Sequence, residues 1–233
     1  MIVLGLSTSS ARGSVSVLRE STLLAHIVYD GGTSHAETIF SVLDRSLAAA
    51  GVTTSGLDAI ACDVGPGSFT GVRVAVAASQ GIALALAIPA VGVQSLAAMA
   101  FAARARQAGR SVLAVLDARK GEVFAALFDV RGTCVWGPTH RPSAEPDDLI
   151  ALVAQHDALV VGEMGSRVPG LPDPVRGDDL DLPDAAMVAR AAGVMLAAHP
   201  PAAFDAALLE PVYVRAPDAR PMVTSVPKPP SGE

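Results

Sequence analysis

The stretch Asp63-Val64-Gly65-Pro66-Gly67-Ser68-Phe69-Thr70-Gly71-Val72-Arg73 contains the residues whose types and spacing could bind an anion. It lies between the apolar run 59–62 and a second apolar run that reaches Ala87, which predicts a strand, a tight turn and a long helix. Such a junction can bind phosphate, because free N–H groups and the helix dipole converge there. It lacks the lysine of a P-loop and the glycine spacing of a dinucleotide site. The local sequence favours the alternative, a packing turn in which Ser68 or Thr70 caps the helix.

Metal and nucleophilic chemistry find little support in the residue spacing. No two of the five histidines are four residues apart, so no helix face presents a pair of imidazoles; they are His26, His35, His140, His156 and His199. Neither cysteine has a histidine at ligand spacing. Because there is no Gly-x-Ser-x-Gly elbow, Ser68 is expected to cap a helix rather than to act as a nucleophile. We therefore predict no catalytic residue, no metal and no cofactor.

The composition bounds the remaining function classes. The chain has 233 residues, is 51% hydrophobic with a mean hydropathy of +0.43, and carries a net charge of −6. No basic leader or uninterrupted membrane-length run is present, and Cys62 and Cys134 lie in apolar runs typical of reduced core thiols, so we expect a cytoplasmic protein without membrane contact. The acidic charge argues against direct binding of nucleic acid. The only basic cluster is interpreted as a solvated helix end; it comprises Arg104, Arg106, Arg110, Arg119 and Lys120.

The order of the expected elements is the same in the two halves of the chain. In the first half we expect strands at 2–7, 14–18 and 23–28, a helix that a Ser34–Glu37 capping box opens and Gly51 ends, a strand at 59–64 and a helix at 68–87. A strand at 89–93 and a helix that Ser95 caps and that runs to about Ala108 follow. In the second half we expect strands at 112–117, 122–129 and 133–136, a helix at 146–155, a strand at 158–162 and a helix at 184–199.

This duplicated βββαβα order indicates an α/β protein of two ribonuclease-H-like subdomains, the fold of the actin, Hsp70 and sugar-kinase superfamily. We expect subdomains at 1–108 and 109–215, with the last helix able to pack back on the first subdomain, and a disordered tail at 216–233. Working members of that superfamily hold Mg-ATP between the halves, with a carboxylate after the first strand of each half. The only candidates for nucleotide binding are Asp117 in the second half and Ser7, Thr8 and Ser9 in the first, where no carboxylate occurs.

Several motifs resemble the bacterial TsaB (YeaZ) family. They are Met1 to Leu18, the helix from Ser34, Gly65 to Arg73, Gly92-Val93-Gln94-Ser95-Leu96, Leu116-Asp117-Ala118-Arg119-Lys120-Gly121-Glu122-Val123 and the closing Tyr213-Val214-Arg215. The likeness covers roughly the first 130 residues in order, whereas about 137–200 carries no such motif. Ser7 departs from the family, which usually has Asp there, so nucleotide binding becomes less expected.

The resemblance implies an accessory role rather than a catalytic one. TsaB proteins are inactive paralogues of the catalytic subunit TsaD, whose metal site uses a His-x-x-x-His pair that this sequence lacks. With TsaD and the ATPase TsaE they support transfer of threonylcarbamoyl from its adenylate to the adenosine beside the anticodon of tRNAs that read A-starting codons. The chain would then meet tRNA only through the complex. The alternatives are an ATP-dependent phosphotransferase of the same fold and a metallopeptidase, which the histidine spacing opposes.

The resemblance also places the partner surface on the helices at 35–50 and 68–87. The same surface forms a homodimer when TsaD is absent. The expected interface residues are Ala36, Ile39, Phe40, Leu43, Leu47, Phe69, Val72, Arg73, Val76 and Gln80. The alternative is that these side chains serve the internal core. Val72→Arg or Val76→Arg distinguishes these two interpretations. A charge at a core position should prevent folding, whereas a charge at an interface position should prevent only partner binding.

Overall fold

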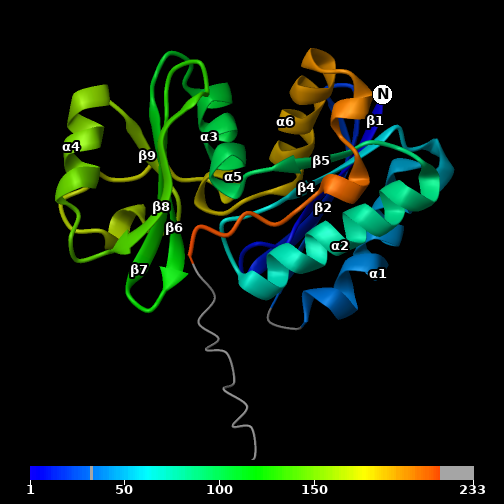
Figure 1. The fold of residues 1–233 in the computed structure, drawn as a ribbon, viewed down its shortest axis with the longest axis horizontal. Helices are drawn as coiled ribbons and strands as arrows, with labels where there is room; N and C mark the ends of the chain where they lie inside the picture. The colour runs from blue at the N-terminus through cyan, green and yellow to red at the C-terminus, as the bar shows by residue number, and fades with distance from the viewer. Residues whose placement is uncertain (32–33, 216–233) are drawn as a thin grey trace, which may run out of the picture.

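The computed structural model describes residues 1–31 and 34–215, which form two lobes, each built on one β-sheet (Figure 1). The expected disordered tail at 216–233 lies outside the described residues. The sheet of the first lobe has the strand order β3-β2-β1-β4-β5, with β1 antiparallel to β2 and parallel to β4. Its strands are β1 (Ile2–Ser7), β2 (Arg12–Arg19), β3 (Thr22–Asp30), β4 (Ala59–Asp63) and β5 (Ala90–Val93).

The second lobe repeats this topology with one strand fewer. Its sheet has the order β8-β7-β6-β9, in which β6 is antiparallel to β7 and parallel to β9. Its strands are β6 (Val112–Arg119), β7 (Glu122–Phe128), β8 (Cys134–Pro142) and β9 (Leu159–Val161). Residues 112–118 and 123–128 are almost entirely buried, because helices cover both faces of this sheet.

Each sheet has helices on both faces (Figure 1). The helices α1 (His35–Ala50) and α2 (Phe69–Leu86) cover the outer face of the first sheet, and α4 (Asp147–His156) covers that of the second. Two helices fill the space between the lobes: α3 (Ser95–Arg106) packs on the second sheet and α6 (Ala185–Ala198) on the first. The short α5 (Asp178–Asp181), which the sequence did not predict, precedes α6.

The two central helices cross the expected subdomain boundary. Leu96 and Met99 of α3 belong to the same buried cluster as Val112 of β6, although α3 lies within the expected first subdomain, 1–108. Val188 of α6 belongs to a cluster with Val3 of β1, although α6 lies within the expected second subdomain. Each half of the chain therefore donates one helix to the core of the other lobe, and the division at 108 and 109 stays a prediction.

Helix capping departs from the prediction at two of three serines. Ser68 caps α2 as expected, with its Oγ accepting from the Gly71 N–H at 3.3 Å. Ser34 makes no side-chain cap bond, because its own carbonyl already accepts from the Glu37 N–H. Ser95 is the first residue of α3 rather than its cap, and its hydroxyl donates to Ser9. The predicted Ser34–Glu37 capping box was therefore wrong.

Two apolar features need separate comment. Within the described ranges, α2 is the one helix long and apolar enough to cross a membrane by length and composition. Its buried side chains, among them Val72, Ala75 and Val76, belong to the core of the first lobe, so we interpret it as a core helix. Cys62 is buried as expected, but Cys134 is exposed, because it begins β8 at the edge of the second sheet.

Candidate functional site

A cavity of about 750 Å³ lies between the lobes. It opens where β1, β4 and β6 end, the place at which parallel strands in open α/β sheets present their ligand sites. The first lobe lines it with 9–11 and 66–70, the second with 116–120, Glu163 and Arg167, and the closing segment with 212–215. The cavity thus brings the glycine-rich turn and Asp117 to opposite walls.

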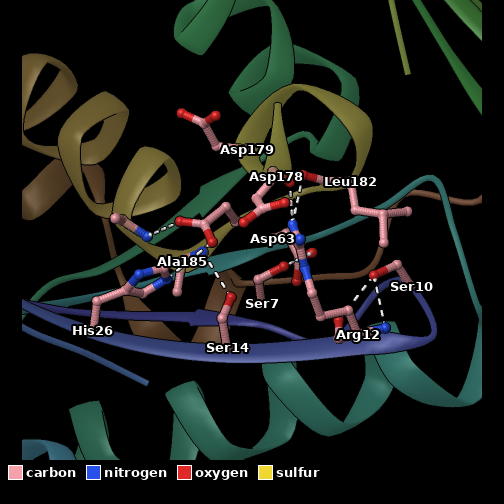
Figure 2. Close-up of polar contacts among 12 residues, drawn as sticks. Ser7, Ser10, Arg12, Ser14, His26, Asp63, Asp178, Asp179, Leu182 and Ala185 are labelled. Atoms are coloured by element: carbon pink, nitrogen blue, oxygen red, sulfur yellow. Dashed lines mark hydrogen bonds and ion pairs between the residues drawn. The ribbon is translucent and has the colours of Figure 1, made fainter. Parts of the chain in front are cut away.

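The candidate hydroxyls of the first half are hydrogen-bonded within the protein. Ser7 Oγ donates to Asp63 Oδ2 at 2.7 Å, and Ser9 Oγ makes a short hydrogen bond to the same oxygen (Figure 2 shows Ser7 and Asp63). Thr8 Oγ1 donates to the Gly71 carbonyl at 2.7 Å. All three residues are buried, so their hydroxyls organise the interior of the turn instead of facing a phosphate.

Asp63 is the residue that sequence reasoning missed. It ends β4 beside β1, and its carboxylate also accepts from the backbone N–H groups of Thr8 and Ser9 at 3.2 and 3.3 Å. The first half therefore has a carboxylate after all, supplied by the neighbouring strand rather than by the first. Burial raises the pKa of Asp63, while hydrogen bonds from Ser9 and Ser7 oppose that rise. An aspartate that ends a strand just before a glycine turn was the available signal.

The glycine-rich turn packs tightly against this buried network. A Cβ added at Gly67 would lie 2.2 Å from the Ser9 carbonyl oxygen, and one at Gly71 would lie 1.9 Å from that of Thr8. Several N–H groups near the helix start already have partners, because Ser68 N donates to Ser9 O at 2.6 Å and Gly71 N to Ser68 Oγ. The packing-turn interpretation therefore explains these glycines without a bound anion.

The second-lobe wall carries charges of both signs. Asp117 Oδ1 accepts from the Arg119 N–H at 2.7 Å, and its Oδ2 lies 3.3 Å from Arg119 Nη1. Burial raises the pKa of Glu163, nearby Asp117 raises it further, and Arg119 and Arg167 partly counter both effects. No group of three His, Cys, Asp or Glu side chains in the described part of the chain could hold a metal ion. This wall could bind a small polar ligand.

A second polar cluster, away from the cavity, attaches α5 and α6 to the first sheet (Figure 2). Arg12 Nη2 donates to the backbone carbonyl of Asp178, and the Ala185 N–H donates to Ser14 Oγ at 2.9 Å. His26 Nε2 lies 2.9 Å from Asp184 Oδ2. Burial alone would raise the pKa of Asp184, but the hydrogen bond and charge of His26 outweigh it, so the pKa is lowered. We interpret this cluster as structural.

The ten expected interface residues divide into three sets by their exposure. Five are buried in the core of the first lobe, which favours the alternative of core positions, because the helices turn these faces onto the sheet; they are Ile39, Leu43, Leu47, Val72 and Val76. Ala36 and Arg73 are exposed, as are Phe40 and Phe69, at 54% and 42%. Gln80 is partly buried and donates to the backbone carbonyls of Ala206 and Leu209. Only the exposed set is accessible to a partner in this structure.

The basic cluster of residues 104–120 is engaged locally. Arg104 donates to the Val130 carbonyl, Arg106 lies 2.6 Å from Asp179, and Arg110 lies 2.9 Å from Asp157. Arg119 pairs with Asp117 in the cavity wall. These contacts agree with a solvated surface rather than with a tract that neutralises phosphates.

The repeated sheets, the helices between them and the cleft at the strand ends give the chain the fold of the actin, Hsp70 and sugar-kinase superfamily. The ROK hexokinase of Thermus thermophilus shares this fold with a TM-score of 0.51 at 16% identity, over 82% of this chain and 99% of that one. At that identity the likeness concerns the fold alone.

Closer comparisons identify the family. The model described as "TsaD: tRNA N6-adenosine threonylcarbamoyltransferase" matches residues 23–149. YeaZ from Pseudomonas aeruginosa is 32% identical with a TM-score of 0.74, over 91% of this chain and 99% of that one. Proteins named "tRNA threonylcarbamoyladenosine biosynthesis protein TsaB" match at 29% identity in Haemophilus influenzae, over 92% and 94% of the two chains, and at 33% in Escherichia coli, over 58% of each. The chain belongs to the TsaB (YeaZ) family.

Proposed function

We propose that this protein is a non-catalytic subunit of tRNA threonylcarbamoyladenosine biosynthesis. It binds and positions a TsaD-type catalytic subunit, together with a TsaE-type ATPase, and meets tRNA only through that complex. The names of its relatives and the match to the transferase's own family model support the pathway. In this role it works in the cytoplasm, where the tRNA substrate of the complex is found.

One observation carries the non-catalytic part of the proposal. In the first half, a phosphate site would use the hydroxyls at residues 7–9. All three hydroxyls instead donate hydrogen bonds within the protein, those of Ser7 and Ser9 to Asp63 and that of Thr8 to the Gly71 carbonyl. The carboxylate of Asp63 is itself fully buried, so it offers no oxygen to a metal-bound phosphate in the cavity. A chain without that half of the clamp is better suited to hold a partner than to transfer a phosphoryl group.

The exposed side of α1 and α2 supplies the proposed partner surface. Phe40 on α1 and Phe69 on α2 keep about half of their side-chain area in water, although large aromatic residues contribute most when buried. Ala36 and Arg73 accompany them on the same two helices. The first occupant is the TsaD-type subunit, and a second copy of this chain occupies the same surface when that subunit is absent.

The test reconstitutes threonylcarbamoyl transfer to tRNA from a TsaD-type subunit, a TsaE-type ATPase and the adenylate-supplying synthase, with and without this chain. We expect transfer to depend on the chain. Phe40→Ala combined with Phe69→Ala should weaken binding of the catalytic subunit by roughly 30-fold or more, since a buried anchor contributes about 2 kcal/mol. Val194→Ala is the matched control, because Val194 is an exposed apolar residue of α6 on the opposite face of the first sheet.

Full transfer without the chain, and no co-elution with the catalytic subunit, would refute the proposal. Tight binding of Mg-ATP by the isolated chain would instead support the phosphotransferase, and Asp117 would become the residue to mutate first. Equal loss of binding in the control variant would show that the aromatic residues are not the anchor.

A further inference from the structure

The last described residues cross the cleft from one lobe to the other. After Leu209, whose carbonyl accepts from Gln80 of α2 at 2.9 Å, the chain runs back along the glycine-rich turn. The Val212 N–H donates to the Val64 carbonyl at 2.7 Å, and a Cβ added at Gly65 would lie 2.9 Å from the Val212 carbonyl oxygen. The segment is therefore seated directly on the turn that forms the first-lobe wall of the cavity.

Alternate side chains of this segment enter different cores. Val212 packs against the buried cluster of the first lobe, whereas Val214 packs against the cluster of α3, β6 and β7 in the second. Tyr213, between them, lies on the outside: its ring centroid is 5.2 Å from that of Phe69, and its hydroxyl accepts from Arg73 Nε at 2.8 Å. Three consecutive residues thus join both lobes and the start of α2.

Arg215 completes the crossing in the second lobe. Its Nη1 donates to the Ala118 carbonyl at 3.1 Å and lies 3.1 Å from Glu122 Oε2. Both charged side chains are largely buried, which makes such a pair less screened than one at an open surface. The β6–β7 hairpin, which carries Asp117 and Arg119, is therefore tied to the closing segment.

The chain also passes between the lobes at two other places. The chain passes from β5 into α3 at residues 93–95 and from α5 into α6 at 181–185, beside the two central helices (Figure 1). Short connections of this kind can act as hinges about which two lobes rotate. The closing segment, drawn orange to red in Figure 1, instead passes below these helices, along the cleft.

We propose that Val212–Arg215 is a strap that locks the two lobes at a fixed angle. The strap thus replaces, with part of the chain itself, the bound ligand that would otherwise draw two such lobes together. This inference does not depend on the proposed partner, because every contact that carries it lies within one chain.

The test measures the distance between the lobes with spin labels in the full chain. Cys134 is an exposed native thiol in the second lobe, and Ser41→Cys adds one on the exposed side of α1, while buried Cys62 stays unlabelled. We expect one narrow distance distribution in the otherwise wild-type chain. Tyr213→Ala combined with Arg215→Ala should broaden it and add longer distances.

Two further variants keep the test decisive. Arg110→Ala removes a guanidinium paired with Asp157 inside the second lobe and should leave the distribution narrow. Arg215→Lys keeps the charge but not the forked geometry and should give an intermediate width. An unchanged narrow distribution in the double variant would overturn the proposal. If circular dichroism shows that the double variant is unfolded, Arg215→Ala alone decides by the same criterion.

Discussion

The close approach of Gly71 to the β1–β2 turn makes a sharp prediction for Gly71→Ala. The new methyl group would meet the Thr8 carbonyl oxygen at 1.9 Å, far inside van der Waals contact. The atom that must move is a backbone oxygen in a buried turn, so a rotamer change cannot relieve the clash. The same movement would break the 2.7 Å hydrogen bond from Thr8 Oγ1 to the Gly71 carbonyl.

The expected cost follows from three effects. Overpacking a buried position costs about 1–3 kcal/mol, and a rigid neighbour places this case at the upper end. The lost hydrogen bond costs about 1 kcal/mol, while the better helix propensity of alanine returns about 1 kcal/mol. The free energy of unfolding should therefore fall by about 3 kcal/mol, which corresponds to a Tm lower by roughly 6–12 °C in a chain of this size.

Thermal and urea unfolding, followed by circular dichroism, measure this effect. Gly81→Ala is the matched control: Gly81 lies in the same helix, is exposed, and would place its Cβ more than 4 Å from any neighbour outside the helix. That variant should gain up to about 1 kcal/mol from helix propensity. If Gly71→Ala proves as stable as Gly81→Ala, the turn does not pack on α2 as described, and the explanation of the glycines as packing residues fails.

Three further outcomes can be measured with the same methods. Ser68→Ala should lower the free energy of unfolding by about 1 kcal/mol through loss of the α2 cap, whereas Ser34→Ala, which removes no cap bond, should change it little. Val76→Arg should abolish the cooperative unfolding transition, because it buries a charge in the core of the first lobe. If the variant folds but no longer binds its partner, Val76 belongs to the interface and not to the core. Because the pKa of Asp63 is raised in the folded protein, its neutral form stabilises the fold. This stabilisation is complete at a pH below the ordinary pKa of 3.8 and is lost as the pH rises through the pKa of the folded state. The difference in unfolding free energy between wild type and Asp63→Asn should therefore narrow from acid to neutral pH, and a widening gap would mean that the hydrogen bonds outweigh burial.

Local sequence patterns predicted most elements but not their partners across the fold. The α1 and α2 helices and the β1–β3 meander follow from short-range periodicity, and the two βββαβα units were recognised from their order. For α6, the sequence analysis allowed packing on the first subdomain. The packing of α3 on the second sheet could not be predicted, since this helix is apolar around much of its circumference and fits either sheet. Asp63 was missed for a related reason: its hydrogen-bond partners lie 54 to 56 residues away, beyond any local pattern.

Periodicity also overstated the partner surface. Val72 and Val76 repeat along α2 at helical spacing, but spacing alone cannot separate a face that covers a sheet from one that awaits another molecule. The exposed Phe40 and Phe69 were named beside them, and only burial in the folded chain distinguishes the two sets. The strap at 212–215 had a sequence signal in Tyr213-Val214-Arg215, but nothing in those three residues indicates that they cross a cleft.

The exchange of central helices has a consequence for synthesis on the ribosome. The inner face of the first sheet, with Val3, Ala59 and Val91, is complete in sequence once β5 has emerged, but α6 covers it. About 90 residues separate β5 from α6, which at about 5–20 residues per second takes roughly 5 to 20 s. Throughout that interval the nascent chain carries an uncovered apolar sheet, so this surface is open to chaperones before it becomes a core.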